Sequence, residues 1–380
     1  MARISISFLV HQPVCLSEFS FFNIGTNKAY INQESTINTI DFLADNCYLI
    51  VNKHLLKLIE NYPDRFYFSV SISGILLENL IKYRPDVIES FQLLAKTKCV
   101  EFLSTNYYQS LSFQYNTDEF HIQIEKQNKL SSKLFGQNSK VFVNTNLIYS
   151  NHLAIELEKL GFEAVIVPAV DRLLKTKAKH SIFGAKTSKS LKCILSDIEL
   201  AKSIATSEKA AAEFEEADVF NLCFNYMEFI ENSPYETFSS MNHLTKFIDN
   251  SIVNKNVEFC NISTFCTQET QAQYDVVDFI SNELPNFDLQ PWLSNSMQYE
   301  SLSKVFSLRS QIIYVNDIKL MEYWNNLLSA DFFLAMCTKF GDAYSKRILF
   351  NAYRSPYDAY ISYMNIISDL ELKLKKLTII

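Results

Sequence analysis

The sequence predicts an α/β protein in which a parallel sheet or barrel is followed by a helical C-terminal domain. Short β-rich runs alternate with amphipathic helical patterns through the first two thirds of the chain, as in repeated βαβ units. After about Pro285, long helical stretches follow without a strand signal. A chain of 380 residues is long enough for one large barrel with an added module. We therefore expect a barrel domain over residues 1–285 and a helical domain over residues 286–380.

Each expected element has its own signal. The strand candidates are short runs rich in β-branched and aromatic residues, at Ile4–Val10, Phe66–Ser71, Val100–Leu103, Val141–Val143, Ala164–Val167, Lys192–Leu195 and Val219–Phe224. Helical periodicity favours helices over Thr36–Glu60, Leu76–Ala95, Thr117–Leu134, Met297–Leu328, Asp331–Phe340 and Ser355–Leu377. The segment Arg172–Lys192 carries seven basic residues without regular periodicity, which predicts a long surface loop.

Composition and charge exclude several functional classes. Only 6 of the 380 residues are glycine, which leaves no glycine-rich loop for a nucleotide phosphate and excludes kinase, P-loop and Rossmann-type sites. The 35 basic and 42 acidic residues give a formal charge of -7, the wrong sign for a general nucleic-acid binder. No stretch approaches the ~18 consecutive apolar residues of a membrane span. We expect no nucleic-acid partner and no membrane segment.

The cysteines and the N-terminus indicate the compartment. The eight cysteines are scattered, without a CxxC pair or the His–Cys spacing of a zinc site. Cys260 and Cys266, the closest pair, fit buried thiols better than a redox couple. The run Met1–Val10 has one basic residue and no small-residue cleavage site, so it predicts a strand rather than a secretion signal. We expect no metal site and a reduced, cytoplasmic protein.

A series of motifs accompanies these elements. The strand Ile4–Val10 runs into His11-Gln12-Pro13, which places an imidazole at the carboxyl end of a first barrel strand, where barrel enzymes carry their active sites. Further motifs follow in order at Phe68–Gly74, Val100–Leu103, Tyr107–Leu111, Val143–Tyr149, Trp292–Asn295, Met336–Lys339, Ser355–Tyr360 and Tyr363–Asn365. With this ordered series, over nearly the whole chain, the protein resembles the α-amylase-type members of glycoside hydrolase family 57.

The resemblance implies a more definite fold and chemistry than the pattern alone. It implies an incomplete, TIM-barrel-like (β/α) barrel of seven strands, with a sugar-binding groove closed on one side by a C-terminal domain of three helices. It also implies an ancestral reaction, retaining hydrolysis or transfer on α-1,4-glucans such as maltooligosaccharides, that needs no cofactor.

Both catalytic positions of the family are changed in this chain. A retaining glycosidase needs two carboxyl groups about 5–5.5 Å apart. The family nucleophile is the Glu of an Asn-Thr-Glu-Leu-Ile-Tyr run, and that position is Asn146 here. The family acid/base is the Asp of an Asp-Tyr-Glu-Thr-Phe-Gly-Glu-His run, and that position is Asn225. Gln109 and Phe332 also replace family histidines. An amide neither attacks the sugar nor delivers a proton, so we predict that the protein is catalytically inactive.

Displaced carboxylates provide the alternative. Glu228 and Glu231 follow Asn225 closely, and Glu101 lies at another strand end, but moving a carboxyl by three residues shifts it several ångströms. The run Tyr235–Phe238 spells part of the acid/base motif about ten residues too late and predicts an ordinary helix start. The alternative is an active α-glucan hydrolase or 4-α-glucanotransferase that uses relocated carboxylates, or an enzyme of changed chemistry.

Several residues are candidates for sugar binding. The resemblance implies that His11 hydrogen-bonds a sugar hydroxyl, although His11 and Gln12 can equally hold a neighbouring loop. Tyr107, Tyr108 and Trp292 are candidates for a stacking platform, with packing in the core as the other interpretation. Asp331 matches an acidic position that faces the groove in the family, and it can also cap a helix.

These observations favour a catalytically silent relative of the family 57 α-amylases. It would bind an α-glucan or a protein partner, the latter an active enzyme of glucan metabolism for which this chain is a regulatory or scaffolding subunit. A third interpretation is an assembly component whose groove is filled by bulky side chains such as Met227 and Phe332.

Overall fold

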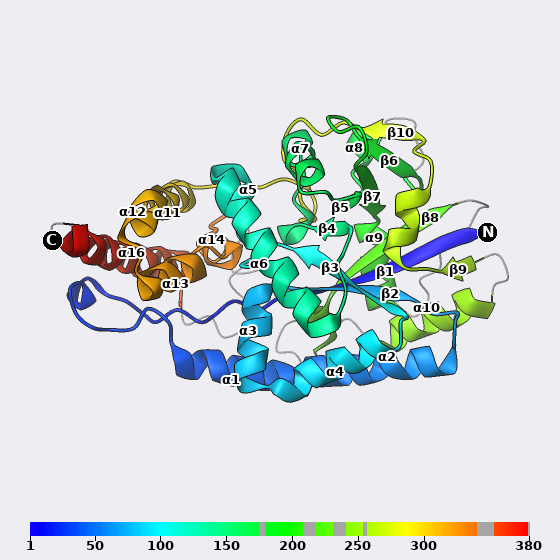
Figure 1. Cartoon of the computed structure of the whole chain (residues 1–380), viewed down its shortest axis with the longest axis horizontal. Helices are drawn as coiled ribbons and strands as arrows, with labels where there is room; N and C mark the ends of the chain where they lie inside the picture. Colours follow the sequence, from blue (N-terminus) through cyan, green and yellow to red (C-terminus); the bar gives the residue numbers. More distant parts are fainter. Residues whose placement is uncertain (175–178, 208–217, 231–240, 254–256, 340–352, 379–380) are drawn as a thin grey trace. The chain divides into compact units, whose positions relative to one another are not determined.

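The computed structural model describes residues 1–174, 179–207, 218–230, 241–253, 257–339 and 353–378 (Figure 1). The chain forms two compact units. The first consists of Met1–His11, Asp41–Tyr107 and His121–Asp288, and the second of Gln12–Ile40, Tyr108–Phe120 and Leu289–Ile380. The division at residues 285 and 286 expected from the sequence stays a prediction.

A closed parallel barrel forms the centre of the first unit. Its strands, in ring order, are β1 (Ala2–Val10), β2 (Phe68–Ile72), β3 (Val100–Thr105), β4 (Val141–Val143), β5 (Ala164–Pro168), β7 (Lys192–Ser196) and β8 (Val219–Asn225). β8 pairs with β1 in parallel from Arg3 to Leu9, and Ser196 of β7 pairs with Asn221 of β8, which closes the ring. The seven predicted strands and the predicted (β/α) barrel are confirmed.

Three short strands were not predicted. β6 (Ile182–Ala185) runs antiparallel to β7, β10 (Ala272–Tyr274) pairs in parallel with β6, and β9 (Val257–Phe259) pairs with the first residues of β1. The expectation that Arg172–Lys192 is a continuous surface loop was therefore wrong, since the segment contains β6 and most of helix α8 (Asp171–Leu174). The physical reason is that Ile182 and Phe183 are buried and pair with β7, although lysines flank them.

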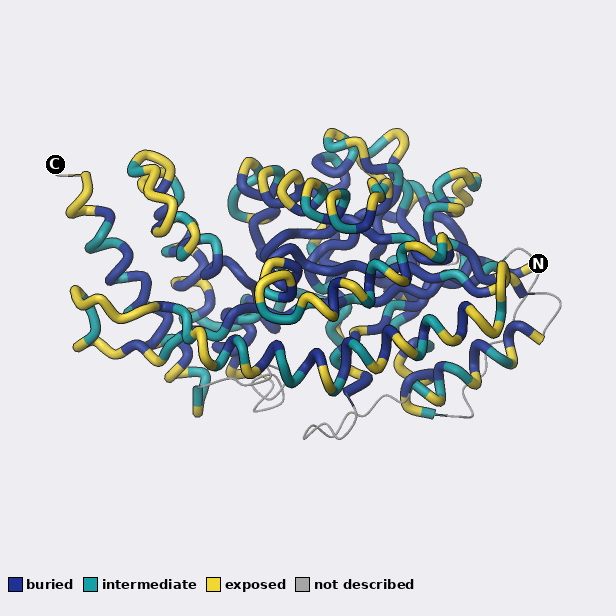
Figure 2. Tube along the Cα trace, turned by 60° about the horizontal axis from the view of Figure 1, so that its bottom comes forward, coloured by how far each residue is buried: buried dark blue, intermediate teal, exposed yellow. Residues whose placement is uncertain are grey.

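Helices cover the barrel strands. In the first unit these are α2 (Leu49–Asn61), α3 (Gly74–Tyr83), α4 (Pro85–Lys96), α7 (Asn151–Lys159), α8, α9 (Ile198–Thr206) and α10 (Met241–Val253), with short 3₁₀ or π turns at Ala44–Tyr48, Thr145–Leu147, Tyr226–Phe229 and Ile262–Thr267. Helices α1 (Gln33–Leu43) and α6 (Thr117–Phe135) have residues in both units. The tube in Figure 2 is buried along the barrel strands and alternates between buried and exposed along the helices.

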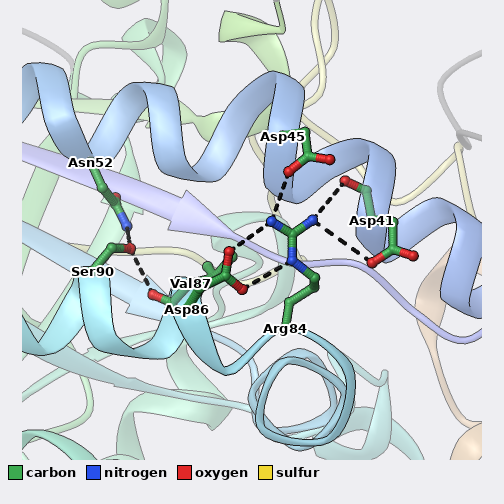
Figure 3. A network of polar contacts seen from close by, with 7 residues as sticks. All are labelled: Asp41, Asp45, Asn52, Arg84, Asp86, Val87 and Ser90. Atoms are coloured by element: carbon green, nitrogen blue, oxygen red, sulfur yellow. Dashed lines mark hydrogen bonds and ion pairs between the residues drawn. The ribbon is translucent and has the colours of Figure 1, made fainter.

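The predicted helix Leu76–Ala95 is broken at Arg84. Pro85 disfavours helical backbone at the preceding residue and begins α4, so two helices form in place of one. The Arg84 guanidinium donates to both oxygens of the Asp86 carboxylate, at 3.0 and 2.7 Å, and to Asp45 Oδ1 at 2.7 Å (Figure 3). It also donates to the Asp41 backbone oxygen at 3.2 Å. The break therefore places one cation where it ties the start of α4 to the end of α1 and to the π turn.

Polar side chains occupy part of the barrel interior. Register partners on neighbouring strands point to the same face, so the pairs Ser7–Ser69 and Ser5–Asn221 share one face. The Ser7 hydroxyl donates to Asn221 Oδ1 at 3.4 Å. An apolar cluster continues the lining of the barrel, and its members include Leu103, Val141, Val143, Ala164, Ile166, Ile194 and Val219. The barrel is thus a packed core, as expected for this architecture.

The second unit is helical. Its elements are a 3₁₀ turn (Phe21–Asn23), α5 (Ser112–Tyr115), α11 (Ser296–Ser307), α12 (Arg309–Val315), α13 (Ile318–Leu327), α14 (Ala330–Leu334) and α16 (Pro356–Thr378). The predicted continuous stretch Met297–Leu328 was wrong because Asn316 ends α12 in the left-handed region, with φ 52°, and the Asp317 side chain caps α13. The predicted helix Asp331–Phe340 is short, since α14 ends at Leu334, and residue 340 lies outside the described residues.

The N-terminal segment of the second unit packs on α16. The Phe19 N–H donates to Ser362 Oγ at 2.8 Å, and the Tyr30 hydroxyl donates to Asp369 Oδ2 at 2.6 Å. The Asp369 side chain is fully buried, and its other oxygen accepts the Gly25 N–H at 2.6 Å. These bonds join residues more than 300 positions apart in the sequence, which is why the second unit begins well before its C-terminal helices.

Candidate functional site

The carboxyl ends of β1 and β2 hold His11 and Ser73 together. Val10 and Ile72 are register partners, and the Ser73 N–H donates to the Val10 carbonyl at 3.1 Å. His11 Nδ1 lies 2.7 Å from Ser73 Oγ. The imidazole is therefore oriented by a neighbouring strand end, and its predicted contact with a sugar hydroxyl stays a prediction.

Tyr107 lies two residues beyond the end of β3 and packs on the start of α3. A β-carbon on Gly74 would lie 2.1 Å from Cδ2 and Cε2 of the Tyr107 ring, so only glycine leaves space for that ring. The Ile75 N–H donates to the Tyr107 carbonyl at 3.1 Å, and Lys126 Nζ lies 3.9 Å from the ring centroid. Tyr107 is completely buried. The Tyr107 ring is therefore packed inside the first unit, with the Lys126 ammonium group against it, which agrees with the interpretation as a core residue.

Asn146, which the sequence resemblance predicts to stand at the position of the family nucleophile, lies in the turn that follows β4. Its backbone is left-handed, with φ 46° and ψ 36°, a region that asparagine tolerates better than most residues. The Asn144 side chain donates to the Ile148 carbonyl at 2.9 Å, and the Asn282 N–H donates to the Asn146 carbonyl at 3.0 Å. These two hydrogen bonds hold the turn, and the residue at its left-handed position carries an amide.

Asn225, which the sequence resemblance predicts to stand at the position of the family acid/base, is the last residue of β8 and the register partner of Leu9. Its side-chain oxygen accepts the Met227 N–H at 3.0 Å and caps the turn Tyr226–Phe229. β5 and β7 separate β8 from β4 along this side of the ring. The amide at 225 therefore has a structural task, and it carries no proton that it can release near neutral pH.

Of the three glutamates considered as relocated catalytic carboxylates, the two that the structure describes do not share one location. Glu101 lies at the amino end of β3, at the opposite end of that strand from the Tyr107 side, and its Oε2 accepts the Ser263 N–H at 3.1 Å. Burial raises the pKa of Glu101, and the hydrogen bonds from Ser263 oppose that shift. Glu228 is exposed in the turn after Asn225. Glu231 and the run Tyr235–Phe238 lie outside the described residues.

One strand-end carboxylate was missed by sequence reasoning. Asp197 directly follows β7, and its Oδ2 lies 2.9 Å from Lys179 Nζ and 3.1 Å from His180 Nε2. Its other oxygen accepts the Leu200 N–H at 3.1 Å and caps α9. Burial alone would raise the pKa of Asp197, but the hydrogen bonds from His180, Lys179 and Leu200 outweigh it and lower the pKa to about 2. An acid that stays ionised and bonded in this way cannot serve as a proton donor. An Asp directly after a strand and before a helix pattern is the signal that would have indicated this cap.

Four predicted site residues lie in the second unit. Gln12 is buried and donates to the Pro13 carbonyl at 3.3 Å, and Tyr108 and Trp292 are both buried. The expectation that Asp331 caps its helix was wrong, because α14 begins at Ala330 with Ser329 at the cap position. Asp331 lies in the first turn, where its Oδ2 accepts the Ser329 hydroxyl at 2.7 Å. Phe332 is buried and packs near Tyr363.

Among the described residues, no His, Cys, Asp and Glu side chains form a group of three or more that could hold a metal ion. No described helix has both the length and the apolar character needed to cross a membrane.

Known proteins share this architecture. The family model for glycosyl hydrolase family 57 matches residues 5–279. A Methanocaldococcus jannaschii protein provisionally named an alpha-amylase is 27% identical over 405 residues, which cover 98% of this chain and 85% of that protein. A GH57 branching enzyme from Thermococcus kodakaraensis, solved in complex with glucose, matches with a TM-score of 0.66 at 10% identity, over 98% of this chain and 94% of that chain.

A second solved structure is the 4-alpha-glucanotransferase from Thermococcus litoralis, which matches with a TM-score of 0.61 at 15% identity. The match covers 87% of this chain but only 55% of that enzyme, so this chain is much shorter than the glucanotransferase. At these identities the solved structures establish the fold alone. The family model covers most of the chain and nearly the whole first unit, and this chain therefore belongs to glycosyl hydrolase family 57.

Proposed function

We propose that this family 57 protein binds an α-1,4-glucan or maltooligosaccharide without hydrolysing or transferring it, and that it has a regulatory or scaffolding role in glucan metabolism. One feature of the sequence carries the proposal: the resemblance assigns Asn146 and Asn225, two amides, to the positions at which the family has its catalytic carboxylates. Family membership and relatives named as α-amylase, branching enzyme and glucanotransferase support a glucan as the ligand.

The chemistry of the amides supports the loss of catalysis. An amide oxygen is a poor nucleophile and an amide nitrogen is non-basic, so neither half of a retaining mechanism can use these side chains. The Asn225 oxygen is already bonded to the Met227 N–H, and the left-handed backbone at Asn146 suits asparagine better than glutamate. The backbone at Asn146 thus favours asparagine over glutamate, whereas the cap at position 225 would accept asparagine or aspartate alike.

The orientation of His11 supports retained binding. A histidine that contacts a sugar hydroxyl must present one ring nitrogen in a fixed direction, and the 2.7 Å contact between Nδ1 and Ser73 Oγ fixes the ring. Calorimetric titration with maltoheptaose tests this role. We expect His11→Ala to weaken binding about tenfold, the loss of one or two hydrogen bonds. His152→Ala, which removes an exposed histidine of α7, should leave the affinity unchanged.

If the native protein does not bind maltoheptaose at millimolar concentration, glucan binding is disproved and the protein-partner role becomes the better account. If it binds and His11→Ala binds equally well, the assignment of His11 is wrong. Each result concerns binding alone and is independent of any turnover.

A second candidate is an active enzyme with relocated carboxylates. Two described residues favour it: Glu228 lies in the turn next to Asn225, and Glu283 directly follows Asn282, whose N–H bonds to the Asn146 carbonyl. A retaining reaction would need these carboxyls about 5–5.5 Å apart and an inverting one about 6.5–9.5 Å apart. Product formation that is abolished by Glu228→Gln or Glu283→Gln would establish this candidate.

A further inference from the structure

A cavity outside the barrel ring is the strongest unassigned feature of the first unit. It has a volume of about 590 Å³ and lies among α8, β6, β10 and the segment 275–280. This volume is within the range of about 300–1,000 Å³ for pockets that hold small ligands. None of the residues that line it was singled out as a binding residue by the sequence.

The cavity has an apolar floor and a polar rim. Leu174, Phe183 and Ile280 line it and are buried, whereas Gln271 and Asp278 line it and are exposed. Buried apolar side chains receive the C–H faces of a ligand, and amide and carboxylate groups at a rim exchange hydrogen bonds with hydroxyls. This combination suits a compact ligand with many hydroxyl groups.

The charges of the described lining residues disfavour strongly anionic ligands. Asp275 and Asp278 contribute two carboxylates, and Arg172 contributes the single cation among the described lining residues. Arg172 is engaged with the Asn286 carbonyl at 2.9 Å, and Asp275 accepts from the Asn151 side chain at 2.8 Å. A phosphate or carboxylate ligand would meet net repulsion, so a neutral ligand fits better.

The segment 275–280, which lines the cavity, is hydrogen-bonded to residues next to the turn at Asn146. Ile280 and Tyr149 exchange both backbone hydrogen bonds, each at 3.0 Å, and the Asn282 N–H donates to the Asn146 carbonyl at 3.0 Å. Asn151 is bonded to the same segment through the Val276 carbonyl at 2.8 Å. A ligand in the cavity would therefore contact the segment that fixes the turn at Asn146.

We propose that this cavity is a second binding site, for a neutral oligosaccharide of two or three sugar units, separate from the strand-end residues. A peptide that extends the sheet at β10 is less suitable, because β10 has only three residues and offers little edge for pairing. The site does not depend on sugar binding by His11, and the two can be tested apart.

Calorimetric titration with maltotriose tests the proposal. The double variant Gln271→Ala and Asp278→Ala should weaken one binding event about tenfold, the loss of two modest hydrogen bonds. Val277→Trp should abolish it, because Val277 lines the cavity, is 80% exposed, and can accept a bulky ring without disturbing the core. The same event should persist in His11→Ala. Glu125→Ala, which removes an exposed carboxylate of α6, is the matched control and should bind like the native protein.

Two outcomes overturn the proposal. One is a native protein that does not bind maltotriose at millimolar concentration, and the other is an affinity that the cavity variants leave unchanged. Loss of all maltotriose binding in His11→Ala with normal binding in the cavity variants would likewise assign the sugar to the strand ends. Thermal unfolding of each variant shows whether it is folded, and a crystal soaked with maltotriose would locate the sugar directly.

Discussion

The ring of Tyr107 occupies the space that a side chain at Gly74 would need. The nearest ring atoms would lie 2.1 Å from a β-carbon at that position, and the ring is completely buried with no exposed surface into which it could move. Gly74 is also the first residue of α3, directly after the Ser73 that orients His11. One glycine thus determines how the ends of β2 and β3 fit together.

Gly74→Ala should therefore be strongly destabilising. We expect a loss of about 1–3 kcal/mol in the free energy of unfolding, since overpacking forces the ring or the backbone to shift. Gly184→Ala is the control, because the nearest atom to a β-carbon there is 3.7 Å away. Urea unfolding of both variants measures the difference. Equal losses in the two variants would show that the Tyr107 ring is not the cause.

The backbone at Asn146 predicts which substitutions that position accepts. With φ 46° and ψ 36°, Asn146→Gly should be nearly neutral, whereas Asn146→Glu should cost about 1 kcal/mol of folding free energy. Both variants remove the same amide, and they differ in whether the residue at the left-handed position carries a side chain. Chemical denaturation of the two proteins checks it. If glutamate is accepted as well as glycine, the turn does not disfavour the ancestral residue.

Asp197 should make the protein less stable in acid. Its pKa of about 2 in the folded protein lies below the ordinary value of 3.8, so ionisation stabilises the fold above about pH 4. That stabilisation, roughly 2 kcal/mol, is lost as the pH falls from 4 to 2. Asp197→Asn should thus be less stable than the native protein at pH 7, and the difference should shrink over this range.

Glu125→Gln is the control for Asp197, because it changes an exposed carboxylate in the same way. Unfolding measured at a series of pH values gives the result. A difference between native protein and Asp197→Asn that stays constant from pH 7 to pH 2 would mean that the ion pairs with Lys179 and His180 do not hold the carboxylate ionised.

Strand and helix patterns predicted the barrel because its strands carry their own signal. In the run Ile4–Val10, apolar residues alternate with serines, a local strand pattern, and Ile4, Ile6, Phe8 and Val10 are buried in the structure. β6, β9 and β10 have only three or four residues and depend on pairing with distant strands, so a local pattern does not reveal them. The break at Arg84 could have been predicted from Pro85, which begins α4. It was missed because the helical periodicity continues on both sides of the proline.

The residues of the candidate site could be proposed from the sequence, but their arrangement could not. The replacement at Asn146 is proposed from a well-kept motif, whereas the run after Asn225 lacks the Glu, Gly and His of the family motif, and both assignments stay predictions. The left-handed backbone of Asn146 and the contact between His11 and Ser73 arise from tertiary structure. The composition of the second unit likewise depends on tertiary structure, because hydrogen bonds such as that from Tyr30 to Asp369 join segments far apart along the chain.

Product analysis after prolonged incubation of the native protein with maltoheptaose decides whether this chain is catalytically silent. We expect no hydrolysis or transfer products above a buffer control, because amides at 146 and 225 cannot act as nucleophile or acid. Products that appear with the native protein and disappear with Glu228→Gln or Glu283→Gln would contradict the account and establish an active enzyme with displaced carboxylates.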